Sequence, residues 1–241
     1  MRIYGRNSLT ERLKVSPKSI ANIFIEKNVE LPQSIKHICK TQNIPIRCIS
    51  EKEFGRISRN IRTQGIIAEI GEFRYSNLED ILSQPAAKLP TILFLDNLND
   101  PQNLGAILRS SACFGGFTLV LPKHDSLEVT EAVLRVASGG ENYVPVSRVT
   151  NLSQAVEIAR KQGYWIAGAL TEGGSEVTGL SLNFPLGLVI GSEAKGIRQG
   201  LIKHLDFRLT IPMSGAGLSF NVAVAAAIFC YEASRQRKNI K

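Results

Sequence analysis

From residue 91 onward the chain alternates short apolar runs with stretches of helical character, and no other feature constrains its fold as strongly. Five runs and one weaker candidate share this pattern: TILFL (91–95), FTLVL (117–121), YWIAGAL (164–170), LGLVI (186–190), RLTIP (208–212) and the weaker YVPV (143–146). Continuously apolar strands that alternate with helices are typical of a parallel sheet covered by helices on both faces. We therefore predict an α/β domain over residues 91–241.

Residues that begin and end helices stand between these runs. Asp100 followed by Pro101 is typical of a helix start, since the carboxylate caps free N–H groups and proline suits the first helical position. Asn151 likewise predicts the start of a helix over 152–162, and Gly163 its end. The order of strands and helices is thus readable along the whole segment.

The first seventy residues predict a smaller α/β unit. Its expected elements are strands over 21–26, 44–49 and 65–70 and a helix over 31–42. Residues 1–72 are interpreted as one domain, and residues 73–90, with their serines and prolines, as a linker.

A basic stripe lies between the last two of these strands. Lys52, Arg56, Arg59 and Arg62 recur every three or four residues, so a helix would place them on one side. Such a row can contact the phosphates of a nucleic acid.

The charge distribution also favours a nucleic acid as partner. The net charge is +8; residues 1–90 hold 15 lysines and arginines against 9 acidic residues, giving +6, and the remainder holds 14 against 12, giving +2. A basic first third suggests a polyanion-binding module joined to a second domain. The alternative is a solvated face that happens to be basic.

Several classes of protein are disfavoured. No run of about 18 apolar residues exists, and the charged start of the chain lacks an export signal. The four cysteines are scattered, which indicates reduced thiols and a cytoplasmic location. Isolated histidines indicate no metal site. Gly215 and Gly217 begin a glycine turn, but Phe220 occupies the third glycine position of a dinucleotide fingerprint, so a nicotinamide cofactor is not expected.

Three polar turns follow predicted strands, at the edge where open α/β sheets bind ligands. Their residues are LDNLNDPQNLGAILRSSACFGG (95–116), LVIGSEAKGI (188–197) and IPMSGAGLSFNVAVAAAIFCYEASRQR (211–237). Arg109 stands among small residues in the first, and Glu193 follows Gly191 in the second. Ser219 and Asn221 precede a long apolar helix in the third. Each has a purely structural interpretation, as a solvated arginine, an acidic turn residue or a helix cap.

Taken together, the three turns resemble the motifs of the SpoU (TrmH-type) family, RNA 2′-O-ribose methyltransferases of the SPOUT class. DPQNLGAILRSSACFG matches the first motif, IGSEAKGI the second and IPMSGAGLSFNVAVAAAI the third, in the same order. IYGRNSLTERL and RTQGIIAEI resemble the small ribosomal-protein-like RNA-binding domain of the two-domain members that methylate 23S ribosomal RNA. The resemblance covers residues 1–72 and 91–241.

This resemblance implies a trefoil knot in the carboxyl-terminal part, a homodimer whose active sites use both subunits, and S-adenosylmethionine as cofactor. The catalytic residues that it implies are Arg109, Asn103, Glu193, Ser219 and Asn221. The implied cofactor-binding residues are Gly191, Ile211, Phe220, Leu218 and Gly196. The candidate RNA-binding residues are Arg56, Arg59 and Arg62 of the basic stripe, together with Arg6 in the amino-terminal segment.

The expected chemistry is methylation of a ribose 2′-hydroxyl in structured RNA, with large-subunit ribosomal RNA as the expected target. Such a transfer needs alignment of the reactants and removal of one proton. Arginine stays charged, so stabilisation of the developing alkoxide describes Arg109 better than a literal base. Two alternatives remain open. One is a catalytically silent RNA-binding assembly factor, and the other is a methyltransferase for transfer RNA or antibiotic resistance.

Overall fold

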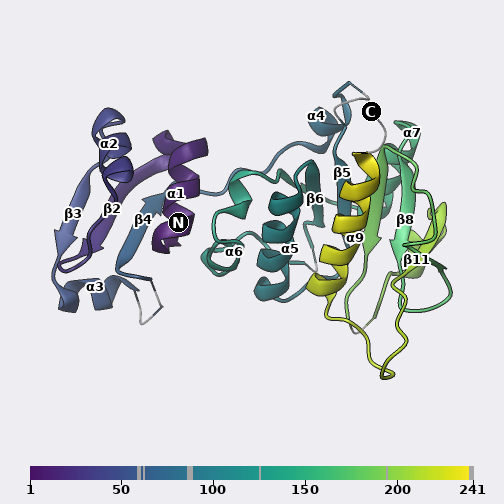
Figure 1. Cartoon of the computed structure of the whole chain (residues 1–241). Coiled ribbons are helices and arrows are strands. Elements are labelled where there is room, and N and C mark those ends of the chain that lie inside the picture. The colour runs from purple at the N-terminus through teal and green to yellow at the C-terminus, as the bar shows by residue number, and fades with distance from the viewer. Residues whose placement is uncertain (59–60, 62, 86–88, 125, 194, 239–241) are drawn as a thin grey trace.

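Two β-sheets organise the chain in this computed structural model, a small mixed sheet and a large parallel one, each with its own helices (Figure 1). The structure describes residues 1–58, 61, 63–85, 89–124, 126–193 and 195–238. Within that part of the chain, no helix combines the length and apolar character needed to cross a membrane.

The small domain contains four strands in the order β1-β4-β2-β3, of which only β2 and β3 run parallel. Its elements are β1 (Arg2–Tyr4), α1 (Gly5–Val15), the 3-10 helix η1 (Pro17–Ser19), β2 (Ile20–Glu26), α2 (Gln33–Thr41), β3 (Ile46–Ile49), α3 (Glu51–Ser58) and β4 (Ile66–Ile70). Neighbouring residues of β4 enter different cores: Ile66 packs in the cluster that includes α1 and α2, and Ile67 packs with Phe54 of α3. Alternate residues of a strand point to opposite faces, so helices cover both sides of this sheet.

The predicted small unit is found, with two differences. β1 and α1 were not predicted, because Arg2–Tyr4 is too short to show a period and α1 is polar over most of its length. The basic stripe is the other difference. Lys52 and Arg56 lie exposed on α3, but the helix ends at Ser58 and Ile61 is not helical; Arg59 and Arg62 lie outside the described residues. One helix that carries all four was therefore not found.

The stretch expected to be a linker contains packed structure. Helix α4 (Leu78–Leu82) buries Leu78, Ile81 and Leu82, and Ser76 forms a parallel bridge with Ser147 of the large sheet. Residues 76–82 thus pack against the large domain. The boundaries at residues 72 and 90 stay predictions.

The large sheet has seven parallel strands in the order β7-β6-β5-β10-β8-β11-β9. Its elements are β5 (Thr91–Leu95), α5 (Pro101–Phe114), β6 (Phe117–Pro122), α6 (Glu131–Ala137), the 3-10 helix η3 (Gly140–Asn142), β7 (Val146–Val149), α7 (Leu152–Lys161), β8 (Trp165–Ala169), β9 (Ser175–Glu176), β10 (Leu186–Ile190), α8 (Gln199–Ile202), β11 (Phe207–Thr210) and α9 (Val222–Arg237).

Helices cover both faces of this sheet, as the apolar runs predicted. Leu93 and Leu95 of β5 pack in the cluster that contains residues of α5, α6 and α9, whereas Ile92 and Phe94 pack with α4, α7 and α8. The fold class is therefore confirmed; the trefoil knot stays a prediction. Because all seven strands run parallel, the chain leaves β5, β10 and β11 at one edge of the sheet.

Candidate active site

Three polar side chains from the three polar turns meet at this edge. The amide nitrogen of Asn221 donates to Glu193 Oε1 at 2.7 Å and to Asn103 Oδ1 at 2.9 Å. Asn103 Nδ2 donates to Glu193 Oε2 at 3.5 Å, and the backbone N–H of Val222 donates to Glu193 Oε1 at 3.2 Å. The three residues, here called the polar cluster, thus join the beginnings of α5 and α9 to the loop after β10.

Helix capping places two members of the cluster. Asp100 accepts the N–H of Gln102 and Pro101 begins α5, so Asn103 falls in its first turn. Asn221 Oδ1 accepts the N–H groups of Ala223 and Val224, which makes Asn221 the N-cap of α9. Its amide nitrogen remains available to the cluster. One side chain therefore fills the structural role and also builds the site, while Ser219 makes no cap contact with α9.

Arg109 lies on the exposed side of α5, away from the cluster. Among the residues that the structure describes, its side chain forms no hydrogen bond or ion pair, with Asn103 and Glu193 or with any other. At helical spacing its neighbours on the helix surface are Ala106 and Cys113, three before and four after. Within one chain, Arg109 therefore forms no hydrogen bond or ion pair with the polar cluster, whose members are Asn103, Glu193 and Asn221.

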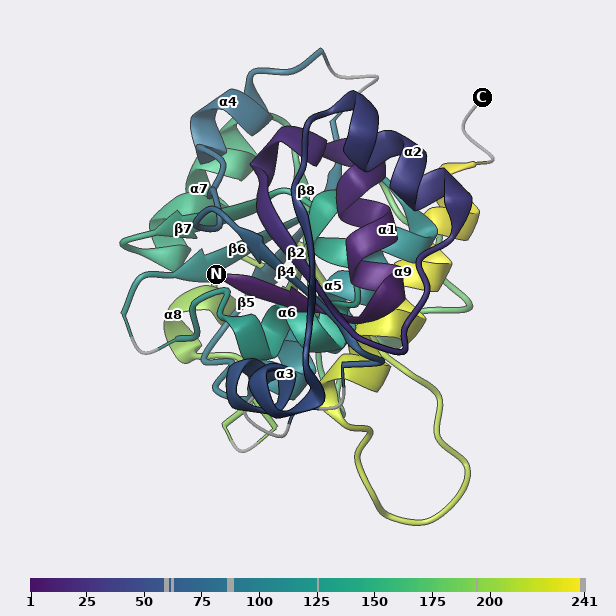
Figure 2. The ribbon, with the colours of Figure 1, turned by 90° about the vertical axis from the view of Figure 1, so that its left-hand side faces the viewer.

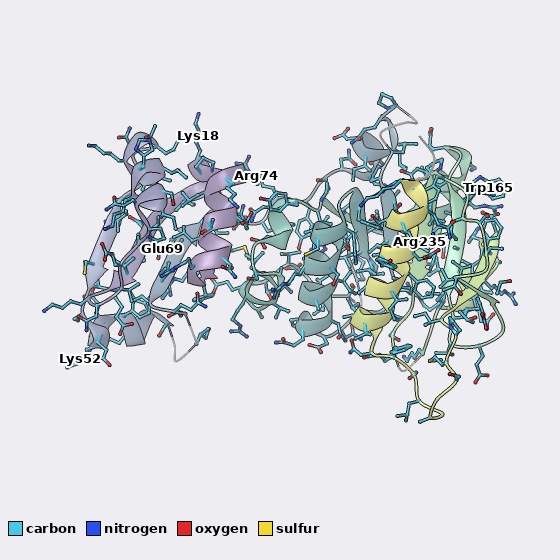
Figure 3. All side chains as sticks on the ribbon, in the orientation of Figure 1. Lys18, Lys52, Glu69, Arg74, Trp165 and Arg235 are labelled. Atoms are coloured by element: carbon cyan, nitrogen blue, oxygen red, sulfur yellow. The ribbon has the colours of Figure 1, made fainter. Side chains whose placement is uncertain are left out.

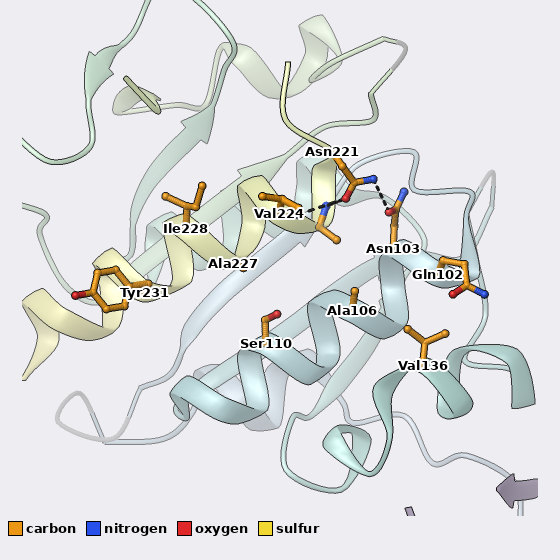
Figure 4. Close-up of a pocket in the computed structure, with 11 residues that line it drawn as sticks. Gln102, Asn103, Ala106, Ser110, Val136, Asn221, Val224, Ala227, Ile228 and Tyr231 are labelled. Carbon is orange, nitrogen blue, oxygen red and sulfur yellow. Dashed lines mark hydrogen bonds between the residues drawn. The ribbon is translucent and has the colours of Figure 1, made fainter. Parts of the chain in front are cut away.

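A groove lies between α5 and α9, lined on α5 by Ala106 and Ser110 (Figure 4). It encloses about 610 Å³, and its apolar floor includes Ala106 on α5 and Val224, Ile228 and Tyr231 on α9. Val224 is 47% and Tyr231 56% exposed. The long apolar helix α9 therefore exposes one apolar side in the single chain.

A second cavity, of about 370 Å³, lies on the other side of the cluster and is called here the loop cavity. Four of the five predicted cofactor-binding residues line it: Gly191, Gly196, Ile211 and Phe220. Two of the predicted catalytic residues, Glu193 and Ser219, line it as well. Leu218, the fifth, is 76% exposed and does not line it. Glu193 thus belongs both to the loop cavity and to the polar cluster.

Glycine is required in the loop after β10 that lines this cavity. A Cβ on Gly191 would lie 2.1 Å from the carbonyl carbon of Gly196, and Gly196 itself has φ +61°. The backbone of the loop after β10 therefore folds closely back on itself, which leaves backbone groups at the cavity wall. Apolar side chains such as Ile211 and Phe229 supply the remaining wall. The arrangement suits a flat ligand with polar edges.

An ion pair that was not predicted from the sequence holds this loop. Asp96, fully buried at the end of β5, accepts the backbone N–H of Arg198 at 2.9 Å and pairs with its guanidinium at 2.6 Å. The Asp96 carboxylate therefore connects Arg198, which follows the loop that carries Glu193, to the segment between β5 and α5. A lone aspartate after an apolar run carries no signal for such a contact, because its partner lies 102 residues away.

The electrostatics of the cluster leave a charge available. Glu193 is exposed and accepts from two amide side chains and one backbone N–H, and no cation among the described residues pairs with it. Among the described residues, no group of three or more His, Cys, Asp or Glu could hold a metal ion. The carboxylate can therefore orient a polar or cationic group brought by a ligand or by another chain.

The predicted RNA-binding residues lie elsewhere, on the small domain. Arg6 on α1 and Arg56 on α3 are exposed, and neither lines the groove or the loop cavity. Lys52 of α3 points outward at the lower end of the small domain (Figure 3).

Comparisons with known proteins give one family model for each of the two parts of the chain. The model of the SpoU rRNA methylase family matches residues 90–231, and a model described as RNA 2′-O ribose methyltransferase substrate binding matches residues 2–76. A Staphylococcus saprophyticus protein assigned by name to the TrmH family of tRNA/rRNA methyltransferases is 34% identical over 99% of this chain and 96% of its own length. A Bacillus subtilis protein assigned to the same family is 31% identical over the same shares of the two chains.

Among solved structures, the SpoU methyltransferase AviRb from Streptomyces viridochromogenes in complex with AdoMet superimposes with a TM-score of 0.80. The match covers 99% of this chain and 91% of that chain, at 22% identity. At this identity the likeness concerns the fold alone, and it extends over both domains.

Proposed function

The chain belongs to the SpoU rRNA methylase family, and from that premise we propose that it methylates a ribose 2′-hydroxyl in structured RNA, with large-subunit ribosomal RNA as target and a cytoplasmic location. One observation carries the proposal: Glu193 is shared between the loop cavity and the polar cluster. A methyl donor in that cavity and a hydroxyl at the cluster would lie next to each other.

S-adenosylmethionine is the proposed donor, and it supplies a methyl carbon activated by a sulfonium. The tight fold at Gly191 and Gly196 and the apolar wall formed with Ile211 fit its adenosine part. Phe220 is half-exposed at the same cavity and offers backbone groups and a ring face. Leu218 retains a proposed role only if the loop over 212–220 closes on the ligand.

Arg109 is proposed to stabilise the alkoxide that forms as the ribose hydroxyl loses its proton. A guanidinium keeps its proton at all ordinary pH values, so charge and hydrogen bonding are what it offers. Asn103, Glu193 and Asn221 are proposed to position the arginine and the ribose, with Ser219 shaping the adjacent wall. Alignment of hydroxyl and methyl carbon accounts for most of the expected rate enhancement.

Arg109 reaches such a site if a second copy of the chain covers the groove, and we propose a homodimer. In the single chain Arg109 contacts no member of the polar cluster, while Val224, Ile228 and Tyr231 form an apolar stripe next to its helix face. Exposed apolar patches of this kind are typical of protein interfaces. Light scattering should give twice the 26.4 kDa chain mass, and Val224→Glu should give the single chain and remove methyl transfer.

The small domain is proposed to hold the RNA. In two views at right angles, α3 and the loop that leads into α9 lie at the same lower edge of the molecule (Figures 1 and 2). RNA bound to the exposed Arg6 and Arg56 can therefore extend toward the polar cluster. Arg59 and Arg62 are proposed for the same contact and lie outside the described residues. Binding that depends on phosphate contacts weakens steeply as salt rises.

The test is incubation with labelled S-adenosylmethionine and whole-cell RNA, followed by nucleoside analysis and primer extension. We expect 2′-O-methyl nucleosides at one position of large-subunit ribosomal RNA. Label on base nitrogens would contradict ribose chemistry, and a transfer-RNA or antibiotic-site position would identify the alternative targets. RNA binding without any turnover would identify an assembly factor. Arg109→Ala should abolish transfer and leave S-adenosylmethionine binding unchanged; full activity in that variant would remove Arg109 from the mechanism.

A further inference from the structure

One segment of the large domain lies between the small domain and the helix that carries Arg109. It comprises α6, η3 and the turn up to Tyr143, residues 131–143, and is called here the bridging segment. In Figure 1 it stands between α1 and α5.

On one side the bridging segment touches the backbone of α5 without any gap. A Cβ on Gly140 would lie 2.9 Å from Arg109 Cα and 3.2 Å from the carbonyl oxygen of Leu108. A Cβ on Gly105, one turn earlier in α5, would lie 2.5 Å from Val136 Cβ. Packed interiors transmit displacement because they contain no free volume to absorb it. A shift of the bridging segment therefore moves the backbone at Arg109.

On the other side the same segment is held by the small domain at both of its ends. At the first end, Glu131 accepts the backbone N–H of Arg2 at 2.8 Å and the hydroxyl of Tyr4 at 2.9 Å. At the second end, the Tyr143 hydroxyl donates to Glu11 on α1. These bonds link residues about 130 positions apart, so they exist only while the two domains are docked.

A buried ion pair strengthens the second end. The Glu141 side chain is fully buried, accepts the backbone N–H of Gly139 at 3.1 Å and pairs with Arg12 of α1 at 3.4 Å. Burial raises the pKa of Glu141 and lowers the pKa of Arg12. A buried charge that loses its partner is strongly destabilising. The turn next to Gly140 therefore depends on a cation that the small domain supplies.

We propose that the small domain positions Arg109 through the bridging segment, so that Arg12 and Glu131 are positioning residues for methyl transfer. RNA that binds or reorients the small domain would thereby adjust the helix that presents the arginine. The inference rests on the role proposed above for Arg109.

The test compares full-length variants on an unmodified transcript of large-subunit ribosomal RNA, with kcat and the KM for S-adenosylmethionine measured at saturating RNA. We expect Arg12→Met to lower kcat about 10- to 100-fold, since misplacing a catalytic group by about 1 Å has an effect of that order. The KM for S-adenosylmethionine should stay within about twofold, because the loop cavity does not contact the bridging segment. Arg12→Lys should recover most of the rate.

Two further variants complete the design. Lys36→Met removes an exposed ion pair elsewhere in the small domain, with Glu30, and should leave kcat unchanged. Glu131→Ala removes the contact at the other end of the segment and should reproduce the fall in kcat. This variant also tests the proposal if Arg12→Met does not fold. Wild-type kcat in both Arg12→Met and Glu131→Ala would overturn the inference, as would a loss that raises the KM for S-adenosylmethionine and that lysine does not rescue. Arg109→Ala in parallel separates this failure from failure of the proposed function.

Discussion

At the sheet edge that carries the polar cluster and at the junction between the two domains, a single carboxylate joins segments that are far apart in the sequence. Glu193 is exposed and is held by the amides of Asn221 and Asn103. Glu141 is buried and is paired with the guanidinium of Arg12. No cation among the described residues pairs with Glu193, so its charge can act on a ligand, whereas the charge of Glu141 is paired with Arg12 and joins two domains.

This difference separates two kinds of effect. Removing the partner of a buried charge changes the free energy of unfolding, but exposed ion pairs change it little. An exposed carboxylate at a cavity instead affects the reaction of the molecule that is bound there. Variants at the junction should therefore be detected first by denaturation, and variants at the polar cluster first by activity.

The largest expected effect on stability is that of Arg12→Met. It leaves Glu141 buried without its cation, so the free energy of unfolding should fall by about 3–5 kcal/mol. Urea denaturation followed by circular dichroism measures it. Lys14→Met, which breaks an exposed pair on the same helix, should cost less than about 1 kcal/mol. Equal losses in the two variants would show that the junction does not depend on the buried pair.

Glu193→Ala should show the opposite profile. Methyl transfer should fall about 100- to 1,000-fold, the effect of deleting one preorganised polar group at a reacting centre. The free energy of unfolding should fall by no more than about 1.5 kcal/mol, since exposed hydrogen bonds are what is lost. Single-turnover assays and urea denaturation of the same preparation test both halves. Unchanged transfer would make Glu193 a structural turn residue.

Asn221 combines both roles, and two substitutions separate them. Asn221→Ala removes the cap of α9 and should lower the free energy of unfolding by about 1–2 kcal/mol. Asn221→Ser keeps a capping oxygen and should restore stability to near wild type. Serine has no amide to donate to Glu193 and Asn103, so methyl transfer should stay low in both variants. Recovery of transfer with serine would leave Asn221 as a cap alone.

The smallest expected effect is a dependence on pH. Burial raises the pKa of Glu141 above that of the unfolded chain, so the folded state holds this proton more tightly. Stability from this group is present below the unfolded pKa of about 4.3 and is lost as pH rises through the folded value. Glu141→Gln cannot titrate, so wild type should lose stability relative to it over that window. Parallel melting curves of the two proteins from pH 4 upward measure their difference in stability. A difference that stays constant with pH would contradict the prediction.

Much of the fold could be predicted because its signals are local. The apolar runs of β5, β6, β8 and β10 match the observed strands within one residue or so, since period and burial are written into neighbouring positions. Asp100 and Asn151 cap helices as expected, each through bonds to N–H groups within three residues. The short β1, the polar α1 and the packed α4 lacked such a pattern.

For the site, the sequence by itself determined the family and the three polar turns, because motif residues are contiguous. Which side chains meet was decided by the tertiary structure. Strand β10 lies between β5 and β8, and this order brings Glu193 to Asn103, 90 residues away. The tertiary structure likewise pairs Asp96 with Arg198 and Arg12 with Glu141. Pairing at such distances along the chain depends on how strands are ordered and helices packed, which no local pattern records.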